Sequence, residues 1–215
     1  MDNNRQYIRK KAKEAKINNG FIINGVEVFV EKNVNFDIEE FLKNIFSKLP
    51  NSLINSVNKI VFGNFYFDSG YVGKSINDSI FINSEENKSA LKSSLIHEMA
   101  HNYITKNYEM VFGDNKLNKE FLTKRKKLYH KIRSSGLKTM PYESFKNHKF
   151  DKKFNKYLSE EIGYNTLSHL ISGIFPTCYS VSSSEEYFSV GMELFYTKKI
   201  KMLEDCPILM EKIVK

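Results

Sequence analysis

The 215-residue sequence has no tryptophan, and its only cysteines are Cys178 and Cys206. Two cysteines cannot build the disulfide framework of a small secreted domain, although one bridge between them is possible. The sequence also has no internal repeat and no low-complexity linker. We therefore expect one domain, in which a cleft near Asn107 separates a lobe over 1–106 from a lobe over 107–215.

Long apolar runs are missing as well. No stretch is apolar and long enough to cross a bilayer, and the first residues lack the apolar core of a signal peptide. We therefore expect no membrane span, and a location either in the cytoplasm or outside the cell after export by another route. The 17 phenylalanines and 12 tyrosines fit a globular chain, which we expect to be monomeric.

Acidic residues are scarce in residues 115–156, the basic segment, which holds 14 Lys and Arg against 3 Asp and Glu. The remainder holds 19 basic and 22 acidic residues, so the net charge of +8 comes from this segment. Its apolar residues at helical spacing predict an amphipathic helix with Lys124-Arg125-Lys126-Lys127 on the solvated face. Without a nucleic-acid-binding motif, we do not expect nucleic acid as the partner. Selection of acidic protein substrates, or docking on a target, stays open.

The first half of the chain is expected to hold a small sheet and helices. Asn24-Gly25 between alternating apolar residues predicts a hairpin over 21–30, and Asp37 predicts the N-cap of a helix. Ser84 is the expected N-cap of the next long helix. The other expected elements are a basic helix over 2–18, strands over 59–67 and 79–82, and a loop over 68–78.

The long helix carries the motif His-Glu-x-x-His. Apolar residues every four positions before and within the motif predict a helix with one buried stripe: Leu91, Leu95 and Met99. His97 and His101 then lie one turn apart, about 6 Å along the axis, on the same face. Two imidazoles so placed can bind one Zn²⁺, and Glu98 lies beside them as a general base towards water.

A catalytic zinc needs a third protein ligand. A third histidine six residues after the second is excluded, because Asn107 occupies that position. Glu120 follows His101 after 18 residues, within Lys119-Glu120-Phe-Leu, and this arrangement resembles the aminopeptidase N family. That family's Gly-Ala-Met-Glu-Asn motif is absent here. Glu120 therefore stays an alternative ligand, for an aminopeptidase-like enzyme.

The other alternative lies near the end of the chain. Tyr179 stands seven residues before Glu186-Tyr187-Phe188, and Cys206-Pro207 follows. With the His-Glu-x-x-His helix, these residues resemble the anthrax lethal factor-like metallopeptidases, which include the clostridial Pro-Pro endopeptidases. In that family a second helix opens on Glu-Phe-Phe-Ala-Glu, and the first Glu of this motif binds zinc.

The resemblance implies a zincin-like α+β fold, with a small mixed sheet and the active-site helix followed by a mainly helical C-terminal lobe. It implies Zn²⁺ held by His97, His101 and Glu186. It also implies that Tyr179 assists Glu98 in hydrolysing peptide bonds of extended protein or peptide substrates.

The strand before the metal helix commonly pairs with such a substrate in zinc peptidases. Ile80, Phe81 and Ile82 are therefore candidate substrate-binding residues on a free edge, although an internal strand fits their sequence equally well.

Two positions depart from the family pattern, since Ile104 and Val190 stand where the family has acids. Carboxylates there would orient the ligands, so a catalytically impaired zinc-binding interaction protein stays an alternative function. Glu193, near the same helix face as Glu186, is a candidate replacement. Ser183-x-x-Glu186 also matches a capping box, which gives Glu186 a possible structural role. The other histidines have no ligand-like spacing: His130, His148 and His169.

Overall fold

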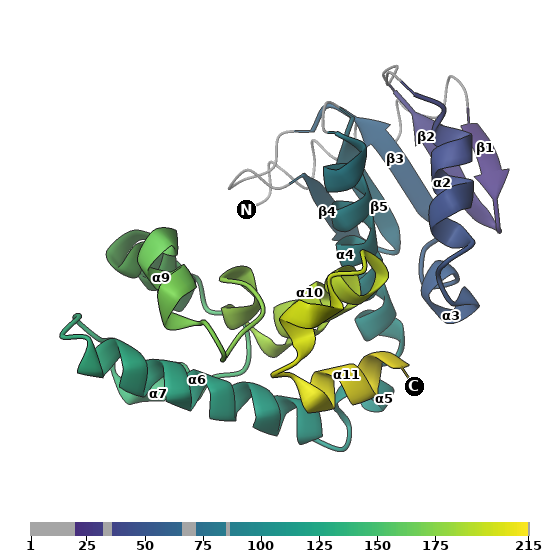
Figure 1. The fold of residues 1–215 in the computed structure, drawn as a ribbon. Helices are drawn as coiled ribbons and strands as arrows, with labels where there is room; N and C mark the ends of the chain where they lie inside the picture. The colour runs from purple at the N-terminus through teal and green to yellow at the C-terminus, as the bar shows by residue number, and fades with distance from the viewer. Residues whose placement is uncertain (1–19, 32–35, 66–71, 85–86, 215) are drawn as a thin grey trace. The chain divides into compact units, whose positions relative to one another are not determined.

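The computed structural model describes residues 20–31, 36–65, 72–84 and 87–214. The basic helix expected over 2–18 lies outside these residues. Two compact units make up the chain, an N-terminal unit over 1–106 and a C-terminal unit over 107–215. The described residues form a mixed α+β protein with a five-stranded mixed sheet and many helices (Figure 1).

The N-terminal unit is a sheet with helices packed on it. Its strands lie in the order β1-β2-β3-β5-β4. β2, β3 and β5 are parallel to one another, whereas β1 and β4 are antiparallel to the strands they pair with. The elements are β1 (Gly20–Ile23), β2 (Val26–Val30), α2 (Ile38–Phe46), α3 (Asn51–Ile54), β3 (Lys59–Gly63), β4 (Gly73–Ile76), β5 (Ser79–Asn83) and α4 (Lys88–Lys106).

Local signals in the first part of this unit are confirmed. Asn24 and Gly25 both have positive φ and connect β1 to β2 as a tight hairpin. The Asp37 carboxylate accepts a hydrogen bond from the backbone N–H of Glu40 at 3.0 Å and caps α2. These two features position the first strands and the helix that follows them.

The prediction of a loop over 68–78 is wrong for Gly73–Ile76, which forms β4. Asn77 and Asp78, with φ of 49° and 60°, connect β4 to β5 as a second tight hairpin. β5 therefore pairs with β3 on one side and β4 on the other, and the predicted free edge at Ile80, Phe81 and Ile82 is wrong. All three side chains are buried. β4 ends the order of described strands, beside α4.

The start of α4, the helix with the His-Glu-x-x-His motif, also differs from the prediction. The Asn87 side chain accepts a hydrogen bond from the backbone N–H of Ala90 at 2.9 Å, so Asn87 caps α4. Ser84 instead continues the sheet, because its backbone N–H donates to the carbonyl oxygen of Gly63 at 2.9 Å.

The C-terminal unit is helical, and its longest helix is α6 (Lys116–Ser134). α6 packs against α5, α7, α9, α10 and α11 and extends along the unit (Figure 1). The other elements are α5 (Tyr108–Phe112), α7 (Tyr142–Phe145), α8 (Lys152–Lys156), the π-helix η2 (Tyr157–Gly163), α9 (Tyr164–Leu170), the 3-10 turn η3 (Tyr179–Val181), α10 (Ser184–Tyr196), the 3-10 turn η4 (Ile200–Leu203) and α11 (Pro207–Val214).

The apolar stripe predicted for α6 is confirmed, since Leu117, Phe121, Leu128 and Ile132 are all fully buried. The solvated face is only partly as predicted. Lys126 and Lys127 are exposed, but Lys124 is 6% exposed and Arg125 is 0% exposed. Two of the four consecutive cations therefore lie inside the unit.

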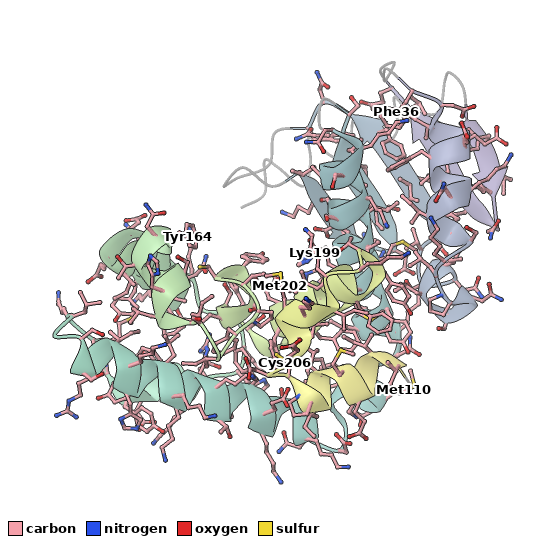
Figure 2. All side chains as sticks on the ribbon, viewed as in Figure 1. Phe36, Met110, Tyr164, Lys199, Met202 and Cys206 are labelled. Atoms are coloured by element: carbon pink, nitrogen blue, oxygen red, sulfur yellow. The ribbon has the colours of Figure 1, made fainter. Side chains whose placement is uncertain are left out.

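Cys178 and Cys206 are both free thiols. Cys206, labelled in Figure 2, is buried immediately before α11. Burial raises its pKa, so the thiol stays protonated at neutral pH. Among the described helices, none is both long enough and apolar enough to cross a membrane.

Candidate metal centre

α4 brings two histidines together on one face. Its buried stripe fixes the rotation of the helix, because Leu91, Leu95 and Met99 are each 0% exposed. His97 and His101 are half-buried on another face, and their Nε2 atoms lie 3.1 Å apart. The rings meet edge to face with centroids 4.9 Å apart. The sequence prediction that both imidazoles face the same point is consistent with this geometry.

Contacts on the far side of α4 hold it against the rest of the N-terminal unit. The Ser56 hydroxyl donates to the carbonyl oxygen of Met99 at 3.2 Å. The buried side chain of Asn102, next to His101, is hydrogen-bonded to the Ser75 hydroxyl of β4. Both bonds involve residues adjacent to or within the His-Glu-x-x-His turn, so they limit its rotation.

Glu98 is half-buried and faces the start of β4. A Cβ atom added to Gly73 would lie 3.3 Å from Glu98 Cγ and 2.8 Å from Ser94 Oγ. The absence of a side chain at Gly73 therefore allows the edge strand to approach α4 at the position of Glu98. Sequence reasoning gave no role to this glycine.

α10 begins at the other candidate ligand. The Ser183 hydroxyl accepts a hydrogen bond from the backbone N–H of Glu186 at 3.1 Å, which confirms the predicted N-cap. The Tyr179 hydroxyl donates to Glu186 Oε1 at 3.1 Å. A capping role of the Glu186 backbone and a separate role of its carboxylate are thus compatible, because they use different atoms.

The candidate ligands meet in one group. His97, His101 and Glu186 each offer one ligand atom, and these atoms all lie within 4.8 Å of one another. The group is therefore close enough to bind a metal ion. All three side chains are half-buried.

Glu120 has a different environment. Its Oε1 accepts hydrogen bonds from the Tyr187 hydroxyl at 2.9 Å and from the backbone N–H of Leu209 at 3.2 Å. Its Oε2 accepts from the backbone N–H of Ile208 at 2.8 Å. These contacts place Glu120 at the first turn of α11, where a carboxylate satisfies backbone N–H groups and complements the helix dipole. Its geometry is that of a structural cap.

The two positions that depart from the family pattern are apolar core positions. Ile104 and Val190 are each 3% exposed. Both residues therefore contribute to packing, and neither can orient a ligand by a hydrogen bond.

The remaining histidines lie outside the ligand group found among the described residues. His130 and His169 are exposed. His148 is half-buried, with Nδ1 at 3.4 Å from the Ser184 hydroxyl, and burial lowers its pKa.

The most important residue that sequence reasoning missed is Arg125. It is the largest fully buried side chain among the described residues, and it contacts the segment between Tyr179 and α10. Its position in the sequence indicates burial, because it lies four residues after Phe121 and three before Leu128, on the buried stripe of α6. The run of cations around it concealed this signal.

Comparison of the chain with models of protein families, with curated proteins and with solved structures finds no match.

Proposed function

We propose that the protein is a zinc-dependent endopeptidase with the zincin-like fold of the lethal factor-like metallopeptidases. The observation that carries the proposal is the grouping of His97, His101 and Glu186. Zinc bonds of about 2.0–2.1 Å in a tetrahedron separate two ligand atoms by about 3.3 Å. The 3.1 Å between the two Nε2 atoms fits this separation. Two imidazoles and one carboxylate are also the donor set of many catalytic zinc sites.

His97, His101 and Glu186 would hold the ion and leave one position open. When bound, Zn²⁺ supplies Lewis acidity, which acidifies water and polarises a carbonyl group. The Glu98 carboxylate would accept the proton of the attacking water and return it to the nitrogen of the leaving amine. Between the two transfers the water oxygen would bond to the carbonyl carbon and the C–N bond would break. One product would then be a carboxylic acid and the other the amine that carries the returned proton.

Tyr179 would donate a hydrogen bond to the scissile carbonyl oxygen as negative charge develops there. Its hydroxyl already lies 3.1 Å from Glu186 Oε1, beside the candidate metal position. During the reaction the hydroxyl would therefore leave Glu186 Oε1 and donate to the scissile carbonyl oxygen instead. Between turnovers its bond to Glu186 would orient a metal ligand, as carboxylates and hydroxyls commonly do around metal sites.

The substrate would pair with β4, and not with β5 as the sequence predicts. β4 ends the order of described strands and approaches Glu98 through Gly73. An extended peptide could add to this edge by main-chain hydrogen bonds, which is a common mode of peptide recognition. The substrate class that follows is an unstructured or locally unfolded protein segment.

The test is hydrolysis of an unstructured protein, with metal content measured on the same samples. The wild type should bind one equivalent of zinc and cleave the substrate, and a chelator should abolish cleavage. Glu98→Gln should fold, keep its zinc and lose nearly all activity, because Gln cannot accept the proton. An active Glu98→Gln variant, or a wild type that binds no zinc, would refute the proposal.

A second candidate function has one observation in its favour. The buried apolar residues Ile104 and Val190 stand where relatives of the proposed family carry acids. The protein would then bind zinc without catalysing hydrolysis and act by interaction. Zinc binding without cleavage of any unstructured substrate would favour this second function.

A further inference from the structure

The guanidinium of Arg125 lies inside the C-terminal unit and is enclosed by backbone carbonyl groups. Nε and Nη2 donate to the Val181 oxygen at 3.0 and 2.7 Å, and Nη2 also donates to the Ser182 oxygen at 2.7 Å. Nη1 donates to the oxygens of Asn147 and Ser144 at 2.6 and 3.2 Å. Every nitrogen of the guanidinium therefore has a carbonyl partner.

Two aromatic rings lie against the same group. The guanidinium carbon lies 4.1 Å from the centroid of the Phe154 ring and 4.9 Å from that of Phe121. Such stacking suits the planar guanidinium better than a lysine ammonium. Burial lowers the pKa of Arg125 to about 9, so it remains protonated and keeps all its donors at neutral pH.

The carbonyls of Val181 and Ser182 belong to the segment that connects Tyr179 to α10. Tyr179 opens this segment, and the cap Ser183 closes it. Local hydrogen bonds hold the 3-10 turn itself, because the backbone N–H of Ser182 donates to the Tyr179 oxygen at 3.0 Å and Ser180 exchanges hydrogen bonds with Thr177. The carbonyl groups of Val181 and Ser182, in contrast, accept three hydrogen bonds from Arg125 of α6, which tie the turn to that helix.

A second contact holds the same segment. The Ser182 hydroxyl donates to Asn155 Oδ1 at 2.9 Å. Arg125 and Asn155 thus fix the segment from two elements, α6 and α8. The Tyr179 hydroxyl at the start of this segment and the Glu186 carboxylate in the first turn of α10 lie 3.1 Å apart.

We infer that Arg125 is a positioning residue of the proposed active site. It holds the 179–183 segment so that the Tyr179 hydroxyl stays beside the Glu186 carboxylate. This inference rests on the proposed zinc peptidase function. Arg125 of the basic segment thus acts inside the C-terminal unit, and not on the solvated face that the sequence predicts.

The test compares Arg125→Lys with a matched control, Lys124→Met. Lys keeps the charge of Arg125 but cannot serve four carbonyls in a fork. Lys124 is an adjacent buried cation that also donates to backbone oxygens, those of Ile174 and Asp205, both at 2.6 Å. Both of these oxygens lie outside the 179–183 segment, so Lys124→Met reports the general effect of losing hydrogen bonds from a buried cation of α6 to backbone oxygens. Thermal unfolding measures the loss of stability in both variants.

Arg125→Lys should lower kcat about 10²-fold, a loss that a displacement of about 1 Å in catalytic groups can cause, with little change in KM. Its zinc affinity, measured by competition with a chelator, should fall about tenfold through the loss of ligand orientation. Lys124→Met should change neither quantity more than about threefold at a similar loss of Tm.

A double-mutant cycle shows whether Arg125 acts through Tyr179. In a Tyr179→Phe background, Arg125→Lys should lower kcat and zinc affinity by less than about threefold. Effects that multiply in the double variant, or an equal loss of zinc affinity in Lys124→Met, would overturn the inference. If Arg125→Lys does not fold, Asn155→Ala replaces it, because it releases Ser182 without removing a buried charge. The same non-additivity with Tyr179→Phe is then expected.

The inference and the proposed function fail in different ways. A wild type without zinc refutes both. A wild type that binds zinc but does not cleave refutes the peptidase function alone, because the cycle in zinc affinity still tests the positioning role. A fully active wild type with additive variants refutes the positioning role alone.

Discussion

Replacing Glu120 and Glu186 separately by Gln should separate stability from metal binding. Glu120 accepts three hydrogen bonds, at 2.8, 2.9 and 3.2 Å, two of them from the first turn of α11. In Glu120→Gln the amide nitrogen replaces one accepting oxygen, so one donor loses its partner and the others lose a charged acceptor. A hydrogen bond to a charged group contributes about 1.5–3 kcal/mol, and an orphaned buried donor costs about 1–3 kcal/mol.

Because part of the loss is recovered by the remaining carbonyl oxygen, we expect a decrease of about 3 kcal/mol in the free energy of unfolding. For a chain of this size, that decrease lowers Tm by about 6–12 °C. Zinc stoichiometry in Glu120→Gln should remain that of the wild type. Differential scanning calorimetry and metal analysis on the same preparation measure both quantities.

Glu186→Gln should show the opposite pattern. Its carbonyl oxygen can still accept the Tyr179 hydroxyl, and the helix cap uses the Glu186 backbone N–H, so Tm without metal should change little. The variant should lose stoichiometric zinc, because a neutral amide replaces the anionic ligand. If Glu120→Gln instead loses zinc at an unchanged Tm while Glu186→Gln keeps it, the ligand assignment is wrong, and the aminopeptidase-like alternative is favoured.

Three further predictions concern neighbours of the site. Tyr179→Phe should retain stoichiometric zinc and lose about 10²–10³ in kcat, as measured by steady-state hydrolysis, and an unchanged kcat would exclude Tyr179 as an oxyanion donor. Gly73→Ala should lower kcat with little loss of stability, because the new Cβ would lie 2.8 Å from Ser94 Oγ, which must shift, and 3.3 Å from Glu98 Cγ, which must give by a few tenths of an ångström. Adding Ser94→Gly should restore activity if the Ser94 contact is the cause. Burial lowers the pKa of His148 from 6.5, so the folded state binds this proton more weakly than the unfolded state. Stability should therefore fall as the pH drops below about 6.5, and His148→Gln should reduce that slope in urea unfolding.

Elements with local causes could be predicted from the sequence. The Asn24-Gly25 turn and the N-caps Asp37 and Ser183 are set by residues within four positions of each other, and all three are observed. The spacing of His97 and His101 is also local, because the helix repeat alone places both imidazoles on one face.

Strand order could not be predicted in the same way. Gly73–Ile76 is short and carries Gly, Lys and Ser, so it has no apolar alternation that would indicate a strand. It is a strand because β5 offers it a pairing edge and Asn77-Asp78 forms the turn. The same pairing makes β5 an internal strand. A residue pattern within β5 cannot reveal whether a neighbour covers its edge.

The candidate third ligand could not be identified from residue spacing alone. Glu120 and Glu186 are both acids near the start of a helix or within one, and both offered a plausible ligand. What distinguishes them in the structure is the set of donors around each carboxylate. Glu120 is surrounded by the backbone of α11 and the Tyr187 hydroxyl, whereas Glu186 lies within 4.8 Å of the two imidazole ligand atoms. Those surroundings arise from contacts between distant parts of the chain.

The buried charges of α6 follow from the irregular backbone of the C-terminal unit. Two stretches between its helices, 171–183 and 197–206, consist of turns and short 3-10 helices, and some of their carbonyl groups accept hydrogen bonds from side chains of α6. Arg125 and Lys124 supply these donors from a regular helix, and Glu120 supplies the matching acceptor for α11.

Burying each charge costs several kcal/mol unless its hydrogen bonds are complete, and an apolar residue would cost less. An apolar residue, however, could not bind a carbonyl and so could not fix an irregular segment in one conformation. The segment that carries Tyr179 needs such fixing if its hydroxyl is to remain beside Glu186. On the proposed function, the need for one fixed conformation of this segment accounts for Arg125, whose guanidinium binds the Val181 and Ser182 carbonyl groups from the buried stripe of α6.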